Sequence, residues 1–166
     1  MTTINIEKLE NIIDSEINGY EKIEKLYADK KELLIKGKAN DLHTIDEKIT
    51  DEYKNITSFA EQRKKISETM NMPTFSMTDI INNIKKEDEK AALKFEEKKA
   101  KVNELAKRIF ELERTNLELL KHGMHVTNKT LEIIIKGLQP ITKEYNQKGE
   151  NITKNQLEMS SIIEEA

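Results

Sequence analysis

The chain has 166 residues, 36% of them charged and 36% hydrophobic, with a formal net charge of −3 at pH 7. This composition, with five Gly and two Pro, is typical of one soluble domain of long amphipathic helices. The absence of Cys excludes a disulfide framework and a thiol nucleophile, and the negative charge argues against nucleic acid as a partner. The N-terminus lacks the pattern of a signal peptide, and no apolar run approaches the roughly 18 residues of a membrane span, so we expect no membrane insertion.

The first two predicted elements are long helices that form an antiparallel hairpin. Apolar residues recur every three or four positions over residues 6–36 and again over residues 41–72, which is the period of an amphipathic helix. Gly37 is expected to end the first helix, and Asn40 or Asp41 to cap the second. Because the connection is short, the two helices should lie antiparallel, with lengths of roughly 50 and 45 Å.

A short third helix and a very long fourth helix follow. Ser76 with Asp79, or Thr78 alone, is expected to cap the third. The fourth is predicted over residues 88–138, which is about 75 Å at the standard rise and exceeds either arm of the hairpin. Its end should therefore be uncovered in a compact monomer. The apolar segment LEIIIKGL at that end needs a partner: the chain's own tail, a second copy or a client.

The predicted fold is all-α, an elongated helical bundle over residues 1–138 with a partly ordered C-terminal tail over residues 139–166. The bundle consists of the hairpin, the short third helix and the very long fourth helix. A helix beginning after Asn151 would place Met159 and Ile163 on one stripe. Because a short, weakly hydrophobic helix is marginal alone, we interpret the tail as a segment that orders on binding a partner.

Two features of the fourth helix have structural interpretations. Charged pairs at i, i+4, such as Glu97 with Lys101 and Glu104 with Arg108, favour a solvated helix face. Asn116 interrupts the apolar series of the same helix, and a buried polar residue at a seam fixes register at the expense of stability. We interpret Asn116 as a residue that forms a structural hydrogen bond across the hairpin.

The residues that carry chemistry favour neither an enzyme nor a metal site. Glu118, His122 and His125 can share one helix face, but neither His belongs to an HExxH motif or has the preceding Glu of a di-iron bundle. No Gly-rich phosphate loop and no GxSxG motif is present. We therefore expect no catalytic residues, no metal and no cofactor.

Three segments, in this order, follow the pattern of a known family. The hairpin carries a Leu-x-x-Ile, a following Lys and an Arg near its end, at Leu42, Ile45, Lys48 and Arg63. The segment FSMTDIINNI is similar to a short helix after a loop, and ELERTNLELLKHG contains an Asn-x-x-Leu-Leu that begins at Asn116. Together these segments resemble the FlgN family of flagellar export chaperones.

The resemblance covers most of the chain and has one local departure. The family often has another Asn one turn before Asn116, where this chain has Leu112 and Glu113. Further along, the segment YNQKG, with Tyr145 and Gly149, is similar to the Tyr-and-Gly ending of this region in the family.

The resemblance implies a non-enzymatic cytoplasmic chaperone that binds hook–filament junction subunits and delivers them to the flagellar export apparatus. In this family the C-terminal region binds the client, which agrees with the uncovered helix end. A client segment is expected to fold against apolar residues of this region. These residues are Leu131, Ile134, Leu138, Ile141, Leu157, Met159, Ile162 and Ile163. The alternative is a helical scaffold that self-associates, for example as a homodimer. It would bury LEIIIKGL against a second copy and have no export role.

Overall fold

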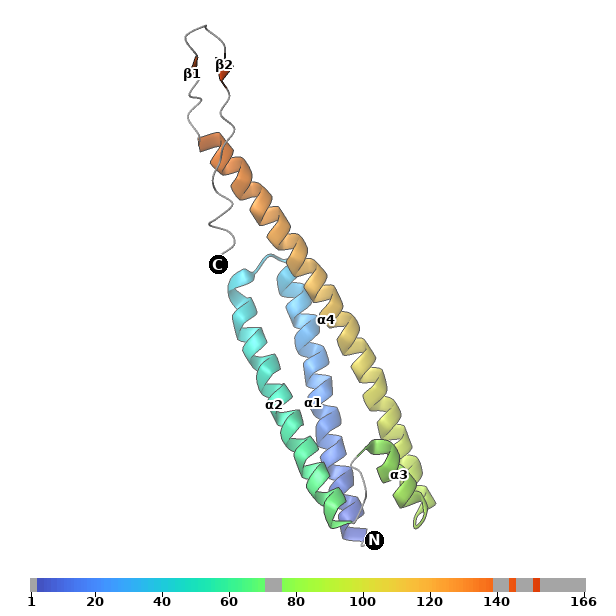
Figure 1. Ribbon diagram of the computed structural model, residues 1–166. Helices are drawn as coiled ribbons and strands as arrows, with labels where there is room; N and C mark the ends of the chain where they lie inside the picture. Colours follow the sequence, from blue (N-terminus) through green and yellow to red (C-terminus); the bar gives the residue numbers. More distant parts are fainter. Residues whose placement is uncertain (1–2, 71–75, 139–143, 146–150, 153–166) are drawn as a thin grey trace. The chain divides into compact units, whose positions relative to one another are not determined.

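In the computed structural model, the described part of the chain forms four helices and one short strand pair (Figure 1). The structure describes residues 3–70, 76–138, 144–145 and 151–152. The elements are α1 (Thr3–Ile35), α2 (Ala39–Thr69), α3 (Met77–Lys85), α4 (Glu89–Leu138), β1 (Glu144–Tyr145) and β2 (Asn151–Ile152). The predicted all-α fold class is confirmed.

Contacts within the chain divide it into two units, residues 1–124 and residues 125–166. The boundary between the units lies inside α4, before the division that the sequence predicts at residue 138. That predicted division stays a prediction, because most residues after 138 lie outside the described part of the chain.

Helix α1 ends at a glycine turn that reverses the chain. Gly37 has a φ of 65°, a conformation that glycine adopts without the steric penalty of a Cβ. The N–H of Lys38 donates to the carbonyl of Leu33 at 3.0 Å, and the N–H of Gly37 donates to that of Leu34 at 3.2 Å. This is the hydrogen-bond pattern of a left-handed C-terminal cap, so the predicted end of the first helix is confirmed.

The start of α2 differs from the prediction. The N-cap is Lys38, which makes no side-chain capping hydrogen bond, so neither Asn40 nor Asp41 caps the helix. The physical reason is the tightness of the turn: the chain enters α2 at Ala39, directly after the glycine cap. Asn40 and Asp41 therefore already lie in the first turn of the helix.

Helices α1 and α2 lie side by side and antiparallel (Figure 1). Ion pairs between the two helices fix this direction, since the residue number on α2 falls as the number on α1 rises. The pairs are Glu16 with Arg63 at 3.0 Å, Lys22 with Glu52 at 3.2 Å and Lys30 with Asp46 at 2.6 Å. The predicted antiparallel hairpin is confirmed.

Helix α3 begins with a side-chain cap. The Oγ of Ser76 accepts a hydrogen bond from the N–H of Asp79 at 3.2 Å and donates one to the Asp79 Oδ2 at 2.6 Å. Of the two predicted arrangements, the one with Ser76 and Asp79 is therefore confirmed. The helix buries Ile80, Ile81 and Ile84, and this burial attaches a short, nine-residue helix to the bundle.

Helix α4 runs parallel to α1 over the first unit. The residue number on α4 rises with the number on α1 in the ion pairs that join the two helices. These pairs are Asp14 with Lys98, Glu21 with Lys101 at 2.7 Å and Glu24 with Arg108 at 2.6 Å. The solvated face predicted for this part of α4 is thus partly an interface, because three of its cations bind carboxylates of α1.

The core of residues 1–124 consists of two clusters of buried side chains. One joins α1, α3 and the start of α4, and it contains Leu9, Ile13 and Phe95. The other joins α1, α2 and the middle of α4. Its buried members are Ile23, Tyr27, Ile49, Ile56 and Ile109. Helix α1 contributes to both clusters, so its wide apolar stripe serves more than one neighbour, as the sequence predicts.

In the second unit, β1 and β2 form an antiparallel ladder of two residues each. Glu144 pairs with Ile152, and Tyr145 pairs with Asn151. The helix predicted to begin after Asn151 does not include Ile152, because Ile152 pairs with Glu144 in the strand ladder. Aromatic and β-branched residues favour extended backbone, and Tyr145 and Ile152 are of these types.

Candidate functional site

The C-terminal part of α4 presents large apolar side chains to solvent. Leu131 and Ile134 are each 50% exposed, Ile133 is 71% exposed and Val126 is 49% exposed. Four such residues lie within three turns of one helix. Surface residues of this kind are unremarkable singly, but a continuous group of them is typical of a binding surface.

Polar contacts within the helix support this exposed segment. Glu132 pairs with Lys129 at 3.1 Å and with Lys136 at 2.7 Å. The hydrogen bonds from Lys136 and Lys129 lower the pKa of the Glu132 carboxyl, so it remains charged well into the acidic range. The Thr130 Oγ1 donates to the carbonyl of Val126 at 2.9 Å. Ion pairs at i, i+3 and i, i+4 each stabilise a helix slightly, which allows the apolar side chains to remain exposed on it.

The predicted client-binding residues have different fates in the structure. Leu131 and Ile134 are half-exposed on α4. Leu138 is the last residue of that helix, and its side chain is not among those that the structure describes. The remaining predicted residues lie outside the described part of the chain. They are Ile141, Leu157, Met159, Ile162 and Ile163.

Two exposed residues of this segment are absent from the predicted site. Val126 and Ile133 continue the helical series of the buried stripe, so periodicity alone groups them with core positions. The structure leaves both exposed. The available signal is helix length: it predicts that LEIIIKGL, which contains Ile133, is uncovered, whereas Val126 lies before that segment.

Asn116 is the buried polar residue of α4, with 4% of its surface exposed. Its Nδ2 donates to the backbone carbonyl of Tyr27 at 2.9 Å, whereas its Oδ1 has no hydrogen-bond partner among the described residues. The predicted structural hydrogen bond of Asn116 is therefore present, and it joins α4 to α1.

The phenol of Tyr27 lies at the same interface. Burial raises the pKa of Tyr27, and the neighbouring Tyr53 and Glu113 raise it further.

The histidines do not assemble a metal site in the described part of the chain. His122 and His125 are exposed on α4, and no group of three or more His, Asp or Glu side chains that could hold a metal ion occurs among the described residues. His43 is also exposed and lies 3.3 Å from Glu47, an ordinary contact one helix turn apart.

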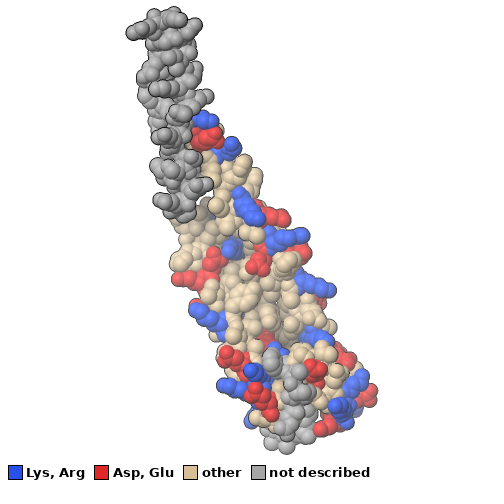
Figure 2. Space-filling model, viewed as in Figure 1, with Lys and Arg blue, Asp and Glu red and all other residues tan. Residues whose placement is uncertain are grey.

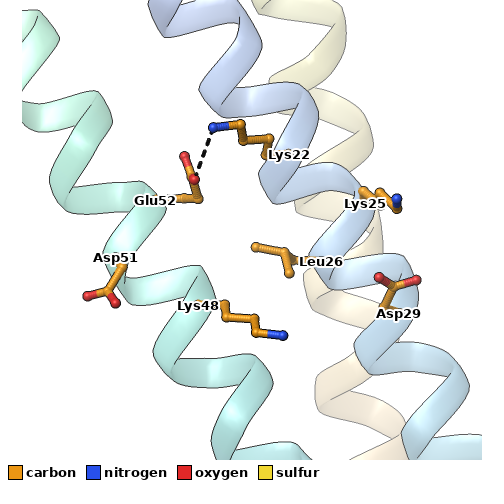
Figure 3. Close-up of a pocket in the computed structure, with 7 residues that line it drawn as sticks. All are labelled: Lys22, Lys25, Leu26, Asp29, Lys48, Asp51 and Glu52. Carbon is orange, nitrogen blue, oxygen red and sulfur yellow. Dashed lines mark hydrogen bonds and ion pairs between the residues drawn. The ribbon is translucent and has the colours of Figure 1, made fainter.

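A groove between α1 and α2 offers little chemistry (Figure 3). Its volume is about 390 Å³. The lining residues are Lys22, Lys25, Leu26, Asp29, Lys48, Asp51 and Glu52. Three lysines oppose three carboxylates, and one of the lysines, Lys22, already pairs with Glu52 at 3.2 Å. A groove that balances its own charge and contributes one apolar side chain lacks the apolar lining of a small-molecule site.

Figure 2 shows basic and acidic side chains intermixed over the described part of the visible face. Among the described residues, no helix is long and apolar enough to cross a membrane. The exposed apolar side chains at the end of α4 make that segment the candidate site.

These features define a class: an all-helical bundle whose longest helix presents apolar side chains of the kind through which helical proteins bind other polypeptides. A family model described as FlgN protein matches residues 1–153. The chain therefore belongs to the FlgN family, the flagellar export chaperones, a chaperone family that binds flagellar subunits and the export apparatus. Comparison with curated proteins and with solved structures finds no match.

Proposed function

We propose that this protein is a non-enzymatic cytoplasmic chaperone that binds hook–filament junction subunits, keeps them unassembled and delivers them to the flagellar export apparatus. The client-binding surface comprises the apolar end of α4 and the tail that follows it. The observation that carries the proposal is the half-exposure of Leu131 and Ile134, together with membership in the FlgN family.

The chemistry of this surface suits reversible recognition of a helix or of a segment that folds on binding. Each aliphatic side chain that a client fully buries contributes about 1.5–3 kcal/mol. Ordering of the client segment and loss of translational freedom oppose this gain. A handful of apolar anchors is therefore enough to hold a client and still permits its release at the export apparatus.

The test is coexpression of residues 1–166 with the candidate junction subunits, followed by gel filtration with light scattering. Ile134→Asp, and the double variant Ile134→Asp with Ile162→Asp, should abolish the stoichiometric complex. Helix content and melting temperature should stay nearly unchanged, because Ile134 is not part of the core. The matched control is Leu93→Asp, which places the same charge at an α4 residue that is 54% exposed in the first unit.

The outcomes separate the proposal from the self-associating scaffold. Loss of the complex in Ile134→Asp but not in Leu93→Asp supports the chaperone. Comparison with residues 1–150 then tests the tail, since loss of the complex assigns client contacts to it and tighter binding identifies it as a mask. No complex with any subunit, together with a dimer mass that persists on dilution, contradicts the chaperone and favours the scaffold.

A further inference from the structure

A second apolar stripe lies on α4 within the first unit, before the candidate client site. Phe110 is 61% exposed, Leu117 50%, Leu120 40% and Met124 60%. Phe110, Leu117 and Met124 are seven residues apart, and Leu120 follows Leu117 by three, so the four occupy a and d positions of a heptad pattern whose other d position is Glu113. A strict seven-residue repeat drifts by about 20° per heptad on a straight helix, and it suits a partner helix that supercoils around it.

A row of cations accompanies the stripe on its solvent side. Three basic residues, also seven residues apart, occupy the e positions of the same heptads: Lys107, Arg114 and Lys121. Side chains at e positions determine which helix binds, through ion pairs between the helices. All three are exposed. Arg114 pairs with Glu111 at 2.7 Å, whereas Lys107 and Lys121 make no ion pair with any part of the chain that the structure describes. Lys107 and Lys121 can therefore form ion pairs with a partner helix, whereas Arg114 already has a partner in Glu111.

The other side of the stripe is closed by the bundle. The g positions of these heptads include Ile109 and Asn116, which are 7% and 4% exposed and pack towards α1. A partner helix therefore meets the apolar stripe and the basic row together, without access to the g side. Two copies of this chain joined antiparallel through the stripe would bring their basic e rows face to face, because e positions oppose e positions in that arrangement. Like charges on both helices disfavour such a dimer.

We infer that this stripe, the residues Phe110, Leu117, Leu120 and Met124 with the basic row beside them, is a docking surface for an amphipathic helix of another protein whose apolar seam is flanked by Asp or Glu. The surface lies wholly within residues 1–124 and is separate from the proposed client site. Complementary charge selects the partner and speeds its association, while the apolar seam holds it.

The experiment measures binding of the full-length protein to a pair of fluorescent synthetic helices by anisotropy. Both peptides have Leu at the a and d positions; one has Glu and the other Lys at the e and g positions. The Glu peptide should bind at least tenfold more tightly than the Lys peptide. Leu117→Asp should weaken its binding at least tenfold, and Leu117→Gln serves as a milder variant if the first perturbs the fold. The double variant Lys107→Glu with Lys121→Glu should invert the preference.

The control is Leu93→Asp, an exposed α4 leucine outside the stripe, which should leave peptide binding unchanged, with helix content followed for every variant. Equal binding of both peptides, no binding of either, or equal loss in Leu93→Asp and Leu117→Asp overturns the inference. A wild-type mass that doubles with concentration and returns to monomer in Leu117→Asp also overturns it, since a second copy would then cover the stripe. None of these readouts depends on a flagellar client.

Discussion

Glu16 is a carboxylate held inside the bundle, with 5% of its surface exposed. The guanidinium of Arg63 lies 3.0 Å away. Burial raises the pKa of the Glu16 carboxyl above its usual 4.5, and Arg63 opposes that rise. The native state therefore holds a proton on Glu16 at a higher pH than the unfolded state does. The free energy of unfolding contributed by this group falls as pH rises through the raised pKa.

This arrangement predicts a pH-dependent penalty for Arg63→Met. At neutral pH the variant leaves a buried, unpaired carboxylate, and breaking a buried ion pair in this way costs about 3–5 kcal/mol. At mildly acidic pH Glu16 takes up a proton, so the loss should shrink. Urea denaturation at both pH values measures the difference. Adding Glu16→Gln to Arg63→Met should remove the pH dependence, and a loss that is the same at both pH values would contradict the assignment to Glu16.

Gly19 of α1 packs tightly against the side chain of Ile56 in α2. A Cβ added at this position would lie 2.7 Å from Cγ1 and 3.1 Å from Cδ1 of Ile56, which is buried in the core. We therefore predict that Gly19→Ala destabilises the protein, since overpacking costs about 1–3 kcal/mol and outweighs the gain of up to about 1 kcal/mol in helix propensity. Chemical denaturation measures the sign.

The matched control for Gly19→Ala is Gly123→Ala, because a Cβ at Gly123 meets nothing within 4 Å and should stabilise the helix. In an Ile56→Ala background, Gly19→Ala should become neutral or stabilising, since the atoms it would strike are gone. If Gly19→Ala stabilises the wild-type chain as much as Gly123→Ala does, the close approach of the two helices is wrong.

At the scale of elements, α3 depends on its first turn. The Ser76 cap satisfies the N–H of Asp79, which is one of the first N–H groups of the helix. We predict that Ser76→Ala lowers the free energy of unfolding by about 1 kcal/mol, with Ser76→Asp close to wild type. Thermal unfolding provides the measurement. Thr78→Ala is the control, because Thr78 contacts Lys99 at 2.8 Å on the surface and does not cap; a larger loss in Thr78→Ala would exchange the two roles.

The pairing of α1 with α4 is a second property of elements. Acidic residues on α1 face basic residues on α4 in a parallel arrangement, and Asn116 bonds to α1 at the far end of that interface. Exposed pairs of this type stabilise a fold only slightly. Together the contacts favour the observed register, since a shift of α4 by one turn would move Arg108 away from Glu24 and Asn116 away from the Tyr27 carbonyl.

At the scale of the whole chain, the core lies within residues 1–124. Every residue of the two buried clusters belongs to that unit, and no residue from 125 to 137 is buried. We predict that a chain truncated after Met124 keeps a cooperative helical fold, with a melting temperature within a few degrees of the full chain. Circular dichroism measures both. Loss of cooperative unfolding would mean that the second unit is required for the core.

The sequence by itself determined the helices, their order and most of their ends. Helix period and hydrophobic spacing are local properties of the chain. The helix end at Gly37 and the helix start at Ser76 also depend on nearby residues, so both were predicted correctly. The cap of α2 was predicted wrongly, because the preceding turn decides which residue comes first in the helix. The apolar character of the α4 end, with Leu131 and Ile134, was also readable from sequence.

Only the tertiary structure decided what each helix face meets. Periodicity identifies an apolar face but carries no information about whether another helix covers it: Val126 continues the period of the core face and is exposed. In the same way, Lys101 was predicted to pair with Glu97 on its own helix, whereas the structure pairs it with Glu21 of α1. Arg108 forms the predicted pair with Glu104 and also pairs with Glu24 of α1. The exposed seam from Phe110 to Met124 followed only from the structure, because its neighbours in space are set by the parallel packing of α4 on α1.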